Sequence, residues 1–213
     1  MYPIPEKLSS TNAAPMLCAG ITVYSPLVRF GAGPGKKVGV VGIGGLGHYA
    51  VIFAKALGAE VWAISRSRAK EADAKAMGAD GFIATAEEGW NEPHEMTFDL
   101  IVNTANSFEG FDLGKYLSLL DVHGRWNNVG MPSSGITVRN QDFCGNGCFL
   151  GTTHLGSRRE MLEMLQLAAD KGLNSWVEEI PMSKEGLQLA MQKLDKSSVR
   201  YRSCMVGYDK AFA

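Results

Sequence analysis

The stretch Lys37-Val-Gly-Val-Val-Gly-Ile-Gly-Gly-Leu-Gly47 decides the fold, because a short apolar run passes directly into a glycine-rich turn. A helical apolar pattern follows at once. Gly42 permits a tight turn, Gly44 has no side chain to block a diphosphate, and Gly47 lets helix and strand pack closely. The alternative is an ordinary turn between strand and helix, but the order strand, turn, helix favours a dinucleotide site formed by Gly42, Ile43, Gly44, Gly45, Leu46 and Gly47.

Strand and helix patterns alternate along the rest of the chain. After the strand at 37–41, the pattern predicts strands at 61–65, 81–83, 98–103, 124–129, 149–155, 177–180 and 200–206. Helices are expected from the turn to about 57, from a cap at Ser67 to 77, and at 111–120, 159–171 and 185–194. This alternation predicts an α/β fold with a doubly wound parallel sheet (Rossmann) in a single domain. We expect this domain at 18–206, after a lead-in at 1–17 and before a tail at 207–213.

Composition excludes several classes of protein. The 213 residues are 46% hydrophobic and 20% charged, which argues against a disordered chain. The net charge of −1 leaves no electrostatic footprint for nucleic acid or an anionic membrane. No apolar run reaches the ~20 residues of a membrane span, and the start of the chain lacks the features of a signal peptide. We therefore expect a cytoplasmic protein with reduced thiols and no nucleic acid or membrane partner.

The segment after the second predicted strand indicates which dinucleotide binds. An NAD site usually has an acidic residue there, but Ile64-Ser-Arg-Ser-Arg-Ala-Lys70 contains none before Glu71. The hydroxyls of Ser65 and Ser67 and the charges of Arg66 and Lys70 suit a 2′-phosphate instead. The alternative is a solvated basic start of a helix, which the helix dipole disfavours. These residues predict NADP(H).

Several motifs resemble one known family. The segment Ala14-Pro-Met-Leu-Cys-Ala-Gly-Ile-Thr-Val-Tyr24 resembles the lead-in to the cofactor domain of zinc-dependent medium-chain alcohol dehydrogenases. The stretches 38–48, 54–59 and 65–74 resemble the cinnamyl alcohol dehydrogenase branch, and 199–210 resembles its fungal NADP-dependent members. The resemblance covers nearly the whole chain. It implies an oxidoreductase that transfers hydride between NADP(H) and a small aldehyde or alcohol.

The resemblance also implies contacts to the nicotinamide end of the cofactor and to its phosphates. Asn103 stands where the family commonly has Asp, and His154 is unusual at its position. A lone histidine on a strand is more often a packing residue, and Arg202 could equally lie on a solvated edge. The positions that the resemblance assigns to cofactor binding are Thr22, Asn103, Thr104, Ala105, Val129, Gly130, Met131, Thr153, His154, Leu155 and Arg202.

Most of the family's zinc ligands have no counterpart in this sequence. Cys18 matches one ligand of the catalytic zinc, but the Gly-His-Glu motif and the four-cysteine lobe are missing. Cys144, Cys148 and His154 have a C-x3-C-x5-H spacing that is not a usual zinc signature. We therefore expect no zinc site, and a lead-in at 1–17 that is a remnant of a missing catalytic domain. His154, His48 and Tyr24 then become the candidates for catalysis.

Three hypotheses of function stay open. The first is a metal-free or fragmentary NADP(H)-dependent oxidoreductase. The second is an NADP-binding module without redox turnover, such as a pseudoenzyme or regulatory subunit. The third is a cofactor-independent isomerase or cyclase that uses the vacated crevice. Since relatives pair through the strand that matches Cys148–His154, and an open sheet edge needs protection, we also expect a homodimer through this strand.

Overall fold

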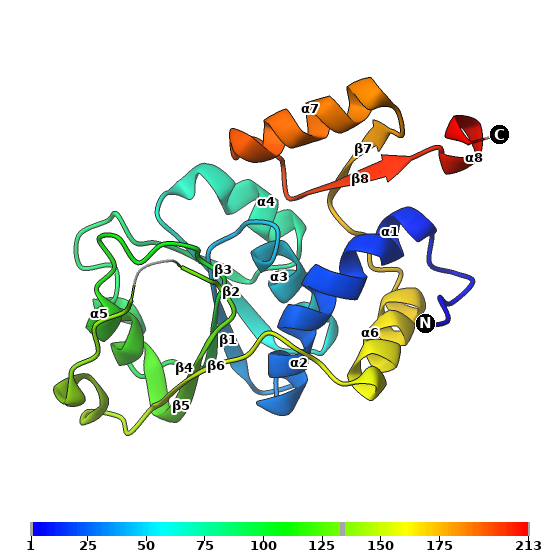
Figure 1. Cartoon of the computed structure of the whole chain (residues 1–213). Helices are drawn as coiled ribbons and strands as arrows, with labels where there is room; N and C mark the ends of the chain where they lie inside the picture. The colour runs from blue at the N-terminus through cyan, green and yellow to red at the C-terminus, as the bar shows by residue number, and fades with distance from the viewer. Residues whose placement is uncertain (1, 133–134, 213) are drawn as a thin grey trace.

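Six parallel strands form one twisted sheet at the centre of the protein (Figure 1). The computed structural model describes residues 2–132 and 135–212. The strand order is β3-β2-β1-β4-β5-β6, so the chain starts in the middle and winds outward first to one side and then to the other. This confirms the predicted doubly wound sheet. Its strands are β1 (Lys37–Val41), β2 (Glu60–Ser65), β3 (Gly81–Ala84), β4 (Phe98–Asn103), β5 (Leu120–Asn128) and β6 (Phe149–Thr152).

Helices cover both faces of this sheet because successive strand residues, which point to opposite faces, are apolar. Val38 and Val40 of β1 join one buried cluster, while Val41 joins the other. The first cluster packs beneath α2, α3 and α6, and the second packs beneath α5 (Figure 1). The bounds are α2 (Ile21–Arg29), α3 (Gly47–Ala56), α4 (Glu71–Ala76), α5 (Leu113–Ser118) and α6 (Arg158–Lys171). Ser157 caps α6, and Gly172 ends it in the left-handed conformation, as the sequence predicts.

Several predicted boundaries differ from the structure; among them, the strand expected at 124–129 is β5 from Leu120, and the strand expected at 200–206 begins at Arg202. The helix expected at 111–120 ends at Ser118, because the buried Leu120 already pairs with Phe98 as the first residue of β5. The helix expected from Ser67 begins as a 3-10 turn, η2 (Arg68–Lys70), and the Ser67 side chain makes no cap hydrogen bond. The strand expected at 149–155 ends at Thr152, after which the chain leaves the sheet and Leu155 becomes exposed.

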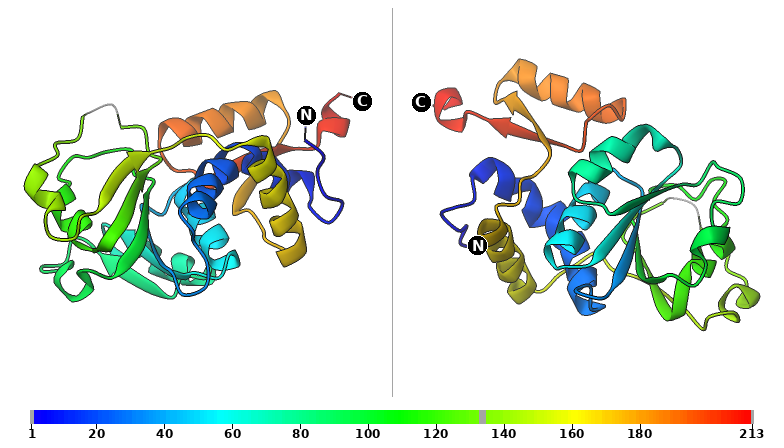
Figure 2. Two further views of the ribbon diagram at one scale, coloured as in Figure 1. Left: turned by 90° about the horizontal axis from the view of Figure 1, so that it is seen from below. Right: turned by 180° about the vertical axis from the view of Figure 1, so that it is seen from behind.

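The last two predicted strands do not join the main sheet. β7 (Val177–Pro181) and β8 (Arg202–Val206) pair in parallel with each other and form a separate two-stranded sheet. The helix α7 (Lys184–Asp195) connects them, and α8 (Tyr208–Ala211) follows β8. The unit packs on α1 (Figure 2) and lies above α4 in Figure 1, held there in part by ion pairing of Arg200 with Asp73. Local pattern predicts a strand but does not choose its partner, which explains the difference.

The segment before β1 is helical, which the sequence pattern did not predict. It comprises α1 (Ser10–Pro15) in the lead-in, a π-helical turn η1 (Met16–Gly20) and α2. Pro15 and Pro26 lie inside these helices, and proline is a signal against helix. The remaining short elements are the 3-10 turns η3 (Glu92–His94) and η4 (Asn140–Phe143). Among the described residues, no helix has the length and apolar character to cross a membrane.

Candidate cofactor-binding cleft

The largest cleft lies at the carboxyl ends of β1, β2 and β4, where the strand order reverses. Ligands of doubly wound sheets bind at this point. The cleft has a volume of about 1310 Å³. Its walls include the whole glycine turn from Gly42 to Leu46, the segment Ser65–Ser67 and the pair Thr104–Ala105. The glycine turn, the segment Ser65–Ser67 and the pair Thr104–Ala105 are distant in the sequence. The structure brings them into one cavity, as expected for residues that bind one ligand.

The glycines of the turn meet the steric requirements that the sequence predicts. Gly42 has a φ of +83°, in the region that favours glycine. A Cβ atom at Gly47 would lie 1.9 Å from the Gly42 carbonyl oxygen, so no side chain fits between helix and strand. A Cβ at Gly44 would meet no protein atom within 4 Å and would occupy open space. Gly44 therefore leaves room for a ligand, while Gly42 and Gly47 close the turn.

The backbone of the turn presents unpaired donors. Within the described residues, the N–H groups of residues 43–46 donate no hydrogen bond to the protein. They stand at the N-terminus of α3, where the helix dipole adds positive potential. This donor set and the space at Gly44 fit the diphosphate of a dinucleotide.

The three cations Arg66, Arg68 and Lys70 of the basic segment after β2 differ in what their side chains bind. Arg68 is neutralised by Glu87 and Glu71, with Nε–Oε1 and Nη1–Oε2 distances of 2.6 and 3.1 Å. Lys70 donates from Nζ to the Ile43 carbonyl oxygen at 2.6 Å. Arg66 is exposed, lines the cleft and forms no ion pair within the described part of the chain. Arg66 can therefore direct its whole guanidinium at an additional anion, while Lys70 has only its remaining N–H groups for this.

The predicted nicotinamide-end residues divide into two groups. Thr104 and Ala105 line the cleft, and Asn103 at the end of β4 is held by a 2.6 Å hydrogen bond from its Nδ2 to Asn128 Oδ1. The others lie close by but outside the cleft-lining set. Thr22 Oγ1 is 3.3 Å from the His154 carbonyl oxygen, which joins α2 to the end of β6. The members of this second group are Thr22, Val129, Gly130, Met131, Thr153, His154 and Leu155.

The three candidates for catalysis do not line the cleft. Tyr24 is buried in α2, with its ring 5.5 Å from that of Phe53. His48 is fully buried behind the glycine turn, and burial lowers its pKa to about 4. His154 is half-buried beyond β6. The structure therefore does not bring the three side chains together, and a role in proton transfer stays a prediction.

The thiols do not assemble a zinc site. Cys18 is exposed in η1, Cys148 is buried before β6, and Cys144 is exposed near η4. Among residues 2–132 and 135–212, no three His, Cys, Asp or Glu side chains come together in a way that could hold a metal ion. A zinc ion with three protein ligands thus does not fit these residues.

Tyr201 is a cleft residue that the sequence reading missed. Its backbone is left-handed, with φ of +71°, and its hydroxyl donates to Asp73 Oδ2 at 2.6 Å. The ring lies 5.7 Å from Lys70 Nζ. Next to it, Arg202 reaches the glycine turn and donates from Nε to the Gly45 carbonyl oxygen at 2.9 Å. The sequence signal for this residue was an aromatic side chain between two arginines. Its partner Asp73 lies more than 120 residues away in the sequence, so the contact could not be predicted.

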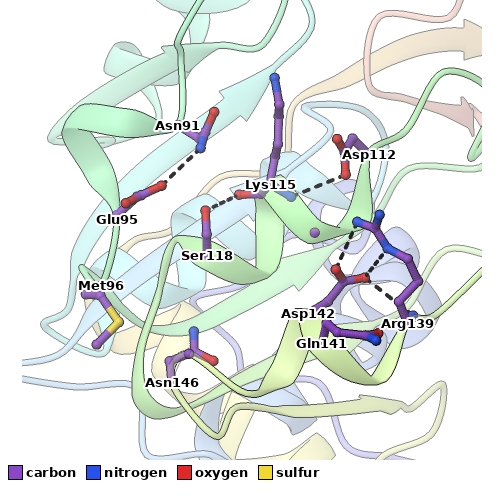
Figure 3. A pocket seen from close by; sticks show the side chains of 12 residues that line it. Asn91, Glu95, Met96, Asp112, Lys115, Ser118, Arg139, Gln141, Asp142 and Asn146 are labelled. Carbon is purple, nitrogen blue, oxygen red and sulfur yellow. Dashed lines mark hydrogen bonds and ion pairs between the residues drawn. The ribbon is translucent and has the colours of Figure 1, made fainter.

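A second hollow of about 460 Å³ lies between α5 and the segment around η4 (Figure 3). Two of its charged groups form an ion pair: Arg139 Nη2 lies 2.9 Å from Asp142 Oδ1. Asn146 donates to the carbonyl oxygens of Leu117 and Leu120. These side chains bind other groups of the protein and stabilise the local structure. We therefore take the cleft at the reversal of strand order as the candidate site.

Comparisons with known proteins agree with this geometry. The family model described as zinc-binding dehydrogenase matches residues 45–170. The chain is 44% identical to NADP-dependent alcohol dehydrogenase 6 of Saccharomyces cerevisiae. The match covers the whole of this chain and 59% of the yeast protein. It is 37% identical to the probable cinnamyl alcohol dehydrogenase 3 of Oryza sativa subsp. japonica, over 93% of this chain and 54% of the relative.

Solved structures show the same similarity. A cinnamyl alcohol dehydrogenase from Sorghum bicolor superposes with a TM-score of 0.86 at 36% identity, over 94% of this chain and 56% of that one. A Helicobacter pylori enzyme of the same name, complexed with NADP(H), superposes with a TM-score of 0.81 at 30% identity, over 98% of this chain and 58% of that one. The chain therefore spans little more than half the length of the relatives it matches.

Proposed function

Because the chain belongs to the zinc-binding dehydrogenase family, we propose that it is the NADP(H)-binding part of an alcohol dehydrogenase-like oxidoreductase. The observation that carries the proposal is the cleft itself. Unpaired N–H groups of the glycine turn stand at one end and the unpaired Arg66 stands at the other. The relatives named as NADP-dependent support the same choice of cofactor.

Each end of the cleft has a distinct task. The N–H groups of residues 43–46 would hold the diphosphate at the start of α3. Arg66, with its planar fork of donors, and the hydroxyls of Ser65 and Ser67 would hold the 2′-phosphate. NADPH supplies a hydride when it is bound. The residues of this chain bind and orient it, and Thr104 and Ala105 form the wall at the end of β4.

For the whole protein we propose the reduction of a small aldehyde or the reverse oxidation of an alcohol, in the cytoplasm. The residues described here do not supply three ligands for zinc. For the chain by itself, the same finding favours a second candidate, a cofactor-binding module without turnover. The two candidates share NADP(H) binding and differ in whether an aldehyde is reduced.

A charge substitution tests the choice of cofactor. We expect Arg66→Ala to weaken NADPH binding more than tenfold and to leave NADH binding unchanged, because a charge-assisted contact contributes about 1.5–3 kcal/mol. Titration calorimetry of both cofactors measures this. Lys75→Ala is the matched control, since it removes the same charge from α4, where Lys75 pairs with Glu71 outside the cleft. Equal affinity of the unmodified chain for NADH and NADPH would contradict the proposal.

A further inference from the structure

Side chains from four parts of the fold hold consecutive carbonyl groups of the glycine turn. Each carbonyl oxygen from residue 42 to residue 45 accepts a hydrogen bond from one of them. The bonds run from Thr104 Oγ1 to Gly42 O (2.6 Å), Lys70 Nζ to Ile43 O (2.6 Å), His48 Nδ1 to Gly44 O (3.3 Å) and Arg202 Nε to Gly45 O (2.9 Å). Since a carbonyl oxygen can only accept, the contact of His48 Nδ1 requires the tautomer that carries the ring proton on Nδ1.

These four bonds also orient the N–H groups of the turn. The peptide unit is planar, so the carbonyl of one residue and the N–H of the next point in opposite directions from one rigid plate. Holding the carbonyls of residues 42–45 therefore orients the N–H groups of residues 43–46. Those are the N–H groups that donate to no acceptor within the described residues. The turn is arranged for an anion before one binds.

His48 differs from the other three donors in its position. Thr104, Lys70 and Arg202 line the cleft and can touch a ligand directly. His48 is fully buried, with ring-centre distances of 3.9 Å to Tyr49 and 5.4 Å to Tyr201. Its Nε2 is also buried and has no hydrogen-bond partner in the described structure. A buried unpaired nitrogen costs stability, so a hydrophobic residue would suit this place better if packing were its role.

We propose that His48 is a positioning residue for the diphosphate of the cofactor. Through Nδ1 it adds a second hydrogen bond to the Gly44 carbonyl oxygen, which already accepts from the His48 backbone N–H at 3.0 Å, and the two bonds together hold the Gly44–Gly45 peptide so that the Gly45 N–H faces the cleft. This inference rests on the proposed binding of NADP(H). It assigns to His48 an effect on phosphate affinity that is transmitted through the backbone and requires no contact with the ligand.

Three ligands separate this effect from a general loss of the site. They are NADPH, adenosine 2′,5′-bisphosphate, which retains a phosphate at the glycine turn, and adenosine 2′-monophosphate, which does not. We expect His48→Leu to weaken the first two about fivefold, the equivalent of one neutral hydrogen bond, and to leave the third within about twofold. His48→Asn keeps an N–H donor near the place of Nδ1 and should restore most of the lost affinity. Calorimetry supplies the affinities, and thermal unfolding verifies that each variant is folded.

The outcomes are distinguishable. If the unmodified chain binds NADPH and His48→Leu binds it equally well, the inference is wrong while the proposed function stands. Equal weakening of all three ligands would also overturn it, because it would indicate a purely structural role. If the unmodified chain does not bind NADPH, the proposed function fails first. Nitrogen NMR of the unmodified chain gives a reading that needs no variant: we expect the His48 proton on Nδ1, and a proton on Nε2 would overturn the inference.

Discussion

Glu160 shows how one residue can secure two helices at once. Its carboxylate accepts from Arg29 Nε at 2.7 Å and from Ser25 Oγ at 3.2 Å, both on α2, and it also caps its own helix through the Ser157 N–H. The side chain is nearly buried. Hydrogen bonding from Arg29, more than any other contact, lowers the pKa of Glu160 to about 2. The ionised carboxylate therefore stabilises the contact between α2 and α6.

This contact predicts a dependence of stability on pH. The pKa of Glu160 is lower in the folded state than in the unfolded state, so its contribution is complete above about 4.5 and is lost as the pH falls toward 2. We expect Glu160→Gln to lower the free energy of unfolding by about 1.5–3 kcal/mol at pH 7, and by much less near pH 2.5. Urea unfolding at the two pH values measures both. Glu163→Gln, which alters an exposed pair with Arg159, should change stability by less than about 0.5 kcal/mol. A loss from Glu160→Gln that does not depend on pH would contradict this account.

Among the elements, β6 is the exposed edge of the main sheet. It pairs with β5 on one side, and Phe149 and Leu150 are 50% and 40% exposed. Thr153 donates its N–H to Asn128 in β5, and the N–H groups of a strand alternate in direction. The N–H of Leu150 therefore points away from β5, toward the open edge. An apolar edge of this kind is normally covered.

We propose that a second copy of the chain covers β6 in a homodimer. Leu150→Pro removes the outward N–H, so we expect it to weaken the dimer at least tenfold while the β5–β6 pairing remains. Leu155→Pro is the matched control, because Leu155 is exposed beyond the end of β6. Sedimentation at tens of micromolar measures the association. A strictly monomeric unmodified chain under these conditions would rule out the dimer.

The elements also show what can be predicted from the sequence. The strands at 37–41 and 98–103 and the turn between β1 and α3 follow from local pattern, and the structure has them at the predicted places. Local pattern does not predict the helices before β1, because Pro15 and Pro26 lie within them. The pairing of β7 with β8 depends on packing that no local pattern encodes. In the site, Ser65, Arg66 and the glycines were predictable from motif spacing. The contact of Tyr201 with Asp73, and that of His48 with the Gly44 carbonyl, depend on tertiary structure.

At the scale of the whole molecule, the chain combines a well-formed cofactor cleft with an incomplete set of metal ligands. Cys18 is exposed and, among the described residues, belongs to no cluster of three metal-ligating side chains. The electrophile that activates a carbonyl would then have to come from a side chain such as His154. A single hydrogen-bond donor contributes only about 10²–10³-fold to catalysis. We therefore expect binding of cofactor and turnover of substrate to be separable in this chain.

This separation predicts the behaviour of the isolated chain. We expect well under one zinc ion per chain after purification without chelator, and NADPH oxidation by aromatic aldehydes that is absent or very slow with chelator present. Elemental analysis and a spectrophotometric assay measure the two. Slow turnover that His154→Ala abolishes would identify a metal-free reductase. Zinc near one per chain would bring Cys18, Cys144 and Cys148 back as ligands, and fast turnover that survives both chelator and His154→Ala would contradict the account.

The contact between Arg202 and the glycine turn has a consequence for biosynthesis. The two partners are 157 residues apart in the sequence. At a translation rate of 5–20 residues per second, the ribosome makes the turn about 8 to 30 s before it makes the arginine that holds it. During that interval the nascent chain contains the residues of β1 and α3 but lacks Arg202, and at first it also lacks Lys70 and Thr104. If the chain binds NADPH as proposed, we expect the cofactor to stabilise the chain with Arg202 in place far more than the nascent chain that lacks it.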